Sequence, residues 1–76
     1  MALHPMTSEA VMTAIDKAFE AQVSALFTVL VGNMVDSGMP GGDMTLDRAT
    51  GMFANALGIA VDAHRRAIVV AGKIGT

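Results

Sequence analysis

Three side chains in the sequence have the chemistry that acid–base catalysis or metal binding requires. Asp16 and Glu20 lie four residues apart, and paired carboxylates can exchange protons or hold a metal ion. His64 carries an imidazole, which changes its charge near neutral pH and is a common metal ligand. The positions three and four residues away from His64 hold only alanine, valine and isoleucine, so no second ligand accompanies it on a helix.

Two interpretations of these residues are open. In the first, His64 lies at the edge of a core and is hydrogen-bonded to a neighbour, while Asp16 and Glu20 belong to an exposed charged stripe. In the second, the protein is a small ligand- or metal-binding helical bundle, with a site around His64 and Asp16/Glu20 completed between subunits. The Glu-x-x-His pattern of carboxylate-bridged bundles is absent from the sequence. We therefore favour the first interpretation and predict no metal and no cofactor.

The glycine-rich stretch SGMPGGDM, residues 37–44, is another candidate site. A phosphate-binding loop of the GxxxxGK[ST] type needs a lysine after its last glycine, whereas an aspartate follows Gly42 here. Met34, Met39 and Met44 recur every five residues, and thioethers can bind Cu(I). Such copper sites usually add histidine or cysteine, and neither accompanies these methionines. The stretch is therefore predicted to be a turn.

The charge balance argues against several classes of function. Five Lys and Arg stand against seven Asp and Glu, and this net charge of −2 does not suit a protein that binds nucleic acid. Arg65 and Arg66 follow Asp62 at the spacing of exposed helical ion pairs. No arrangement of a serine or cysteine nucleophile with a base is visible, and the chain has no cysteine. We do not expect an enzyme.

The first half of the chain is predicted to form a long helix, from about residue 8 to about residue 37. Its main apolar residues are spaced by three or four, as on one side of a helix: Met12, Ile15, Phe19, Val23, Leu26, Leu30 and Met34. Thr7 or Ser8 can cap the start of this helix. Gly38 and Pro40 are a typical helix end.

The second half is predicted to form a helix of similar length, from about residue 45 to about residue 73. The same spacing recurs in it, at Leu46, Ala49, Phe53, Leu57, Ala60, His64, Ile68 and Ala71. Asp43 or Thr45 can cap its start, and Lys73 suits its last turn, before Gly75. The rival interpretation makes residues 67–71, AIVVA, a strand, because β-branched residues favour strands.

Two matched helices joined by a short turn, at about residues 38–44, indicate an antiparallel helical hairpin. The fold class is therefore all-α, with residues 1–76 in a single domain. A chain of 76 residues without cysteine buries only a small core, and such chains usually need a partner.

An excess of apolar residues is the main indication of function. No charge occurs between Glu20 and Asp36, nor between Arg48 and Asp62. Beside its main stripe the second helix carries another, at Met52, Ala56, Ile59, Ala63, Ala67, Val70 and Ile74. A hairpin buries one stripe per helix, so a monomer would expose a long apolar band.

This band predicts self-association, most simply as an antiparallel dimer that forms a four-helix bundle, or as a larger oligomer. Docking to a different protein is the second possibility. We expect a structural, regulatory or adaptor protein that acts through its apolar faces. The residues expected at the interface are Phe19, Leu26, Phe27, Leu30, Phe53, Leu57, His64 and Ile68.

Membrane insertion is the third possibility for the apolar band, and the sequence disfavours it. The uncharged runs are shorter than the roughly 18–20 residues that span a bilayer. The N-terminal residues lack the basic and apolar regions of a secretory signal, so we expect a cytoplasmic protein. Gly51, Gly58 and Gly72 fall at heptad spacing, either as a ridge for close packing of another backbone or as tolerated glycines on a solvent face.

Overall fold

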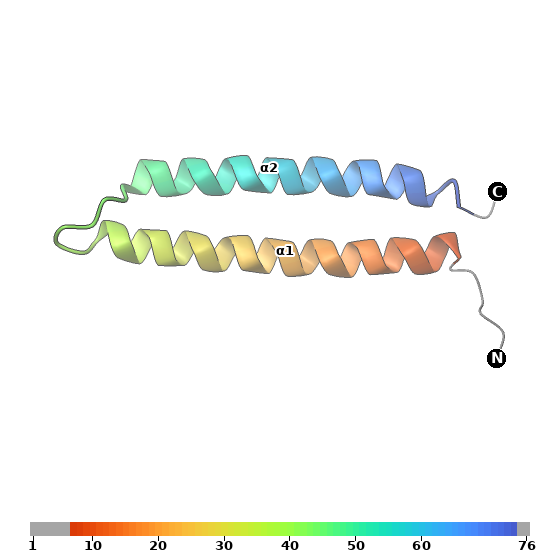
Figure 1. The fold of residues 1–76 in the computed structure, drawn as a ribbon, viewed down its shortest axis with the longest axis horizontal. Coiled ribbons are helices and arrows are strands. Elements are labelled where there is room, and N and C mark those ends of the chain that lie inside the picture. Colours follow the sequence, from red (N-terminus) through yellow and green to blue (C-terminus); the bar gives the residue numbers. More distant parts are fainter. Residues whose placement is uncertain (1–6, 75–76) are drawn as a thin grey trace.

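Two helices lie side by side and run in opposite directions in the computed structural model, which describes residues 7–74 (Figure 1). Helix α1 spans Ser8–Ser37 and helix α2 spans Leu46–Ala71. The all-α hairpin predicted from the apolar spacing is therefore confirmed. Residues 67–71 belong to α2, so the alternative in which they form a strand is wrong.

Each helix begins at a threonine whose side chain caps it. The hydroxyl oxygen of Thr7 accepts a hydrogen bond from the backbone N–H of Ala10 at 3.0 Å. The hydroxyl oxygen of Thr45 accepts one from the N–H of Arg48 at 3.1 Å. These bonds satisfy backbone donors that the first turn of a helix leaves unpaired. Of the two caps considered for each helix, threonine is the one used in both cases.

Helix α2 ends two residues earlier than expected. Gly72 caps its end, and its N–H donates to the carbonyl oxygen of Ile68 at 3.0 Å. Beyond it, the N–H groups of Lys73 and Ile74 reach back only three residues, to Val70 and Ala71. This tightening to three-residue bonds is a common way to finish a helix. Lys73 therefore lies outside the last helical turn, and Gly75 lies outside the described residues.

The connection between the helices reverses the chain with two glycines in different roles. Gly41 has a φ of +79°, a conformation that a side chain would strain. At Gly42 the backbone passes so close to the carbonyl oxygen of Asp36 that a Cβ atom would collide with it. The carboxylate of Asp36 also accepts a hydrogen bond from the N–H of Met44, at 3.2 Å. The predicted turn is confirmed, and its glycines are required by backbone geometry.

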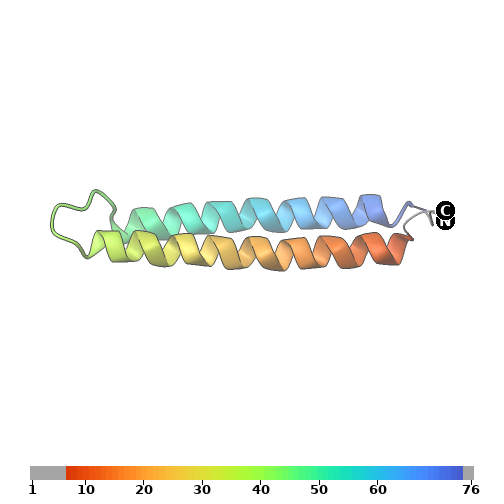
Figure 2. The same ribbon diagram turned by 60° about the horizontal axis from the view of Figure 1, so that its bottom comes forward.

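The hairpin is a single layer of two helices. Its principal dimensions are 59 × 26 × 12 Å, and Figure 2 shows the same pair of helices from a second direction. Among the described residues only Ala49 and Ala71, both in α2, are fully buried. The large apolar side chains between the helices, such as Phe19, Leu26 and Leu57, are half-buried. Packed domains have two or more layers. Because this hairpin has one layer, it covers only one row of side chains on each helix.

The open end of the hairpin is joined by one long-range hydrogen bond. The hydroxyl of Ser8 donates to the carbonyl oxygen of Ala71 at 2.7 Å. This bond links the first turn of α1 to the last turn of α2. It ties the two helix ends together in the register that the hairpin adopts.

Candidate functional site

An apolar groove runs along one side of the hairpin, between α1 and α2. Its wider part has a volume of about 510 Å³ and is lined by residues of both helices, among them Ile15, Phe19, Leu26, Ala56, Ile59 and His64. Its narrower part has a volume of about 100 Å³ and lies closer to the connection, where Leu30, Asn33, Met52 and Phe53 line it. Leu26 and Ala56 line both parts, so the two parts adjoin each other.

The groove carries no charged side chain of the Asp, Glu, Lys or Arg type among the residues that line it. Its polar residues are Gln22, Asn33 and His64. Small side chains of α2, such as Ala60 and Ala63, form much of its floor and walls. The groove therefore offers an uncharged, largely apolar surface that is open to solvent.

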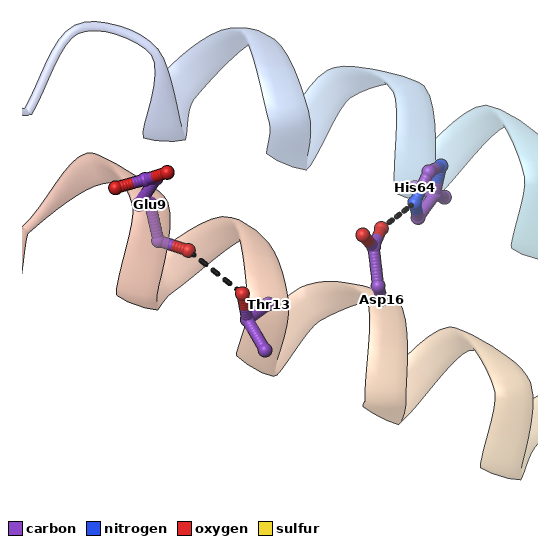
Figure 3. Close-up of polar contacts among 4 residues, drawn as sticks. All are labelled: Glu9, Thr13, Asp16 and His64. Atoms are coloured by element: carbon purple, nitrogen blue, oxygen red, sulfur yellow. Dashed lines mark hydrogen bonds and ion pairs between the residues drawn. The ribbon is translucent and has the colours of Figure 1, made fainter.

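His64 forms an ion pair or hydrogen bond with Asp16 at the wide part of the groove (Figure 3). The distance from Nε2 of His64 to Oδ1 of Asp16 is 2.7 Å, and the two residues come from different helices. The His64 ring also contacts the Phe19 ring, with 4.6 Å between ring centroids. Two residues of α1 therefore contact the His64 side chain, Asp16 through a hydrogen bond and Phe19 through its ring.

The contact between His64 and Asp16 answers the question of which neighbour His64 bonds. We predicted a hydrogen bond from His64 to a neighbour, and the bond exists. A carboxylate partner in another subunit is not needed, because Asp16 of the same chain supplies it. Within residues 7–74 no hydrogen bond or ion pair joins Glu20 to this pair, and no three His, Cys, Asp or Glu side chains gather as a metal site would require.

The expected interface residues divide into three groups. Five of them line the groove: Phe19, Leu26, Leu30, Phe53 and His64. Leu57 and Ile68 are half-buried and do not line it. Phe27 is 58% exposed and lies nine residues from Ala18 of the groove, which is half a turn around α1. Phe27 therefore belongs to the other side of the hairpin.

Three exposed, large apolar residues at the groove were not among the expected interface residues. They are Val29, Met52 and Ile59, and Ile59 is 63% exposed. The second apolar stripe of α2 contained the signal for Met52 and Ile59, since both belong to it. The sequence shows that each helix has two stripes, but it does not show which stripe the partner helix covers.

The opposite side of the hairpin combines charges with apolar residues. Asp16, Glu20 and Phe27 share a side of α1, because four and eleven residues are whole helical turns to within 40°. On α2 the same reasoning places Gly58 and Arg65 together, seven residues apart. The exposed pair Asp62 and Arg66, 2.8 Å apart, does not belong to this side, because Arg66 is seven residues from Ile59 and therefore lies at the edge of the groove.

The glycine row of α2 makes no close contact within the described chain. A Cβ atom placed on Gly51 or on Gly58 would meet no atom within 4 Å. At Gly72 the nearest side-chain atom would be Cε of Met12, at 3.7 Å. Gly51 and Gly58 are therefore not needed for the packing of α1 against α2, whereas Gly72, which caps α2, lies next to Met12 of α1.

Gly58→Ala is expected to stabilise the protein by about 0.5–1 kcal/mol, because alanine restricts the unfolded chain and favours a helix interior. Urea denaturation followed by circular dichroism measures the change in the free energy of unfolding. Gly51→Ala, at an equally open position, serves as the matched comparison. A loss of stability in both variants would contradict this expectation and would assign the glycine row to close packing with another chain.

Helix α1 also has the length and composition of a membrane span, with 30 residues and a mean hydropathy of 1.4 in its most apolar window. The short length of the uncharged runs therefore does not exclude a membrane span in α1, because few charges fall within that window. None of the described residues of α1 is fully buried against α2.

Comparison of the chain with family models, with curated proteins and with solved structures finds no match.

Proposed function

We propose that the protein is a self-associating helical hairpin without enzymatic activity, in which copies pair to form a four-helix bundle. Its role is structural, regulatory or adaptor-like, and it is exerted in the cytoplasm through the apolar sides of the helices. The observation that carries this proposal is the uncovered apolar groove on a chain only one layer thick.

The shape of the chain supports the proposal. Its radius of gyration is 17.6 Å, whereas a compact domain of this length has one of about 11 Å. Two helices side by side cannot enclose a core, since each helix touches its neighbour along one row only. A second hairpin laid on the first supplies the missing layer and converts half-buried side chains into buried ones.

A small ligand- or metal-binding site is the second candidate function. The observation that favours it is the pair His64 and Asp16, which stands beside the wide part of the groove. Two ligands from one chain do not complete a metal site, so a second copy would have to supply the others. Melting of the protein with and without added Zn²⁺ tests this candidate. A rise in melting temperature that His64→Ala abolishes would favour the metal site over simple self-association.

The mass of the protein in solution tests the main proposal. Light scattering coupled to size exclusion, at micromolar concentration, is expected to give at least twice the chain mass of 7.8 kDa. The melting temperature is also expected to rise with protein concentration, because association stabilises the folded state by mass action. A well-folded monomer with a concentration-independent melting temperature would contradict self-association.

A further inference from the structure

We propose that two copies pair through the groove, face to face and antiparallel, with a two-fold axis near Leu26 and Ala56. This inference rests on the self-association proposed above and identifies its face and its orientation. Leu26 and Ala56 are the residues common to both parts of the groove, so an axis at this point lets each copy cover the whole groove of the other. The occupant of the groove is thus a second copy of this chain.

The hairpin exposes enough surface to form an interface with a second copy. The chain exposes 5757 Å², whereas a monomeric protein of its mass exposes about 4,400 Å². The excess of about 1,400 Å² is larger than the roughly 800 Å² that each partner buries in a standard protein–protein interface. The chain therefore exposes more surface than a monomer of its mass, by an amount that one standard interface is large enough to cover.

Charge distinguishes the two sides of the hairpin. None of the residues that line the groove is Asp, Glu, Lys or Arg, and Arg66 lies at its edge, seven residues from Ile59, so pairing through the groove places charges at the rim of the contact and none at its centre. Pairing through the opposite side would cover Glu20 and Arg65. The cores of protein interfaces are poor in charged residues, which favours the groove side as the contact surface.

The shape of the groove favours an antiparallel pair. The half near the connection is narrow and carries the exposed side chains of Val29 and Met52, while the other half is the hollow of about 510 Å³. An antiparallel arrangement places Val29 and Met52 of each copy over the hollow of the other. A parallel arrangement would set hollow against hollow and leave a large void, and protein interiors rarely contain one.

A single substitution at the edge of the groove tests the face. Ile59 lines the groove and is 63% exposed, so Ile59→Asp changes the proposed contact surface without placing a charge inside the hairpin. We expect this variant to keep its helical circular dichroism and to fall to the mass of one chain, 7.8 kDa, at concentrations where the unaltered protein is paired. Val61→Asp is the matched control, because Val61 is 40% exposed on the opposite side of the same helix. It is expected to stay paired.

A spin label at the connection tests the orientation. The chain has no cysteine, so Asp43→Cys provides a single attachment point outside the groove. In an antiparallel pair with its axis near Leu26, the connection of each copy begins at Ser37, about 17 Å from the axis along α1, and the two connections lie in opposite directions from it, whereas in a parallel pair they lie together. Pulsed electron paramagnetic resonance on the paired protein is expected to give a label separation of about 33 Å or more. A separation below about 25 Å, roughly the width of two packed helices, would overturn the antiparallel arrangement.

The outcomes separate this inference from the proposed function. A monomeric unaltered protein would overturn both, and its flotation with phospholipid vesicles would then assign the groove to a membrane. A paired protein that Val61→Asp separates and Ile59→Asp does not would overturn the choice of face alone. Separation by Ile59→Asp with retained helicity, together with pairing of Val61→Asp, would support the groove as the interface.

Discussion

The Leu26→Asp protein is expected to lose most of its helical circular dichroism signal and its ability to pair. Leu26 packs half-buried between α1 and α2 and lines both parts of the groove. Loss of a fully buried leucine side chain costs about 2–5 kcal/mol in protein cores, and a half-buried one costs part of this; the carboxylate adds the cost of its desolvation. Domains of this size rarely have more than about 3–5 kcal/mol of stability from their core.

Phe27→Asp is the matched control for this experiment, since Phe27 is the next residue and is 58% exposed on the other side of α1. This variant is expected to retain both its helicity and its mass. Circular dichroism and light scattering on the two variants under the same conditions make the comparison. Normal helicity and mass in the Leu26→Asp protein would refute the packing of α1 against α2 through this stripe.

Gly42→Val is expected to lower the free energy of unfolding by about 1–3 kcal/mol, the usual cost of forcing extra atoms into a tightly packed place. A Cβ atom on Gly42 would collide with the carbonyl oxygen of Asp36, which is backbone and cannot rotate away. The connection would have to open, and the hydrogen bond from Met44 to the Asp36 carboxylate would be lost with it.

Urea denaturation gives the stability of the Gly42→Val protein. Gly32→Ala is a suitable control, because Gly32 lies within α1 and a Cβ atom there would meet nothing within 4 Å. This control is expected to be neutral or stabilising. Equal stability of Gly42→Val and the unaltered protein would show that the connection accommodates a side chain, against the geometry described here.

Most of the hairpin was predictable because its determinants are local. Spacing of apolar residues identified both helices, and capping residues placed their starts at Thr7 or Ser8 and at Asp43 or Thr45; the structure selects the threonine in each case. The end of α2 was misplaced by two residues, since the sequence cannot distinguish a stop at Gly72 from one at Gly75. The backbone hydrogen bonds after Ala71 span only three residues, and this ends the α-helix at Ala71. The spacing of apolar residues does not reveal such a change in hydrogen bonding.

The candidate site was predictable only in part, because it depends on how one helix is rotated against the other. His64 and Asp16 are 48 residues apart, and their contact follows from the register of the hairpin. The same rotation turns Ile59 toward the groove and Phe27 away from it, although both belong to apolar stripes. Periodicity identifies the stripes of each helix separately, and the packing of the pair selects among them.

The scarcity of buried side chains has a consequence for the protein's behaviour in a cell. With Ala49 and Ala71 as the only fully buried residues described, a lone hairpin has little holding it folded. If copies pair as proposed, folding and pairing form a single equilibrium, and dilution shifts it toward the unfolded chain. Abundance would then act as a switch: copies above the pairing concentration persist, and unpaired ones become substrates for proteases.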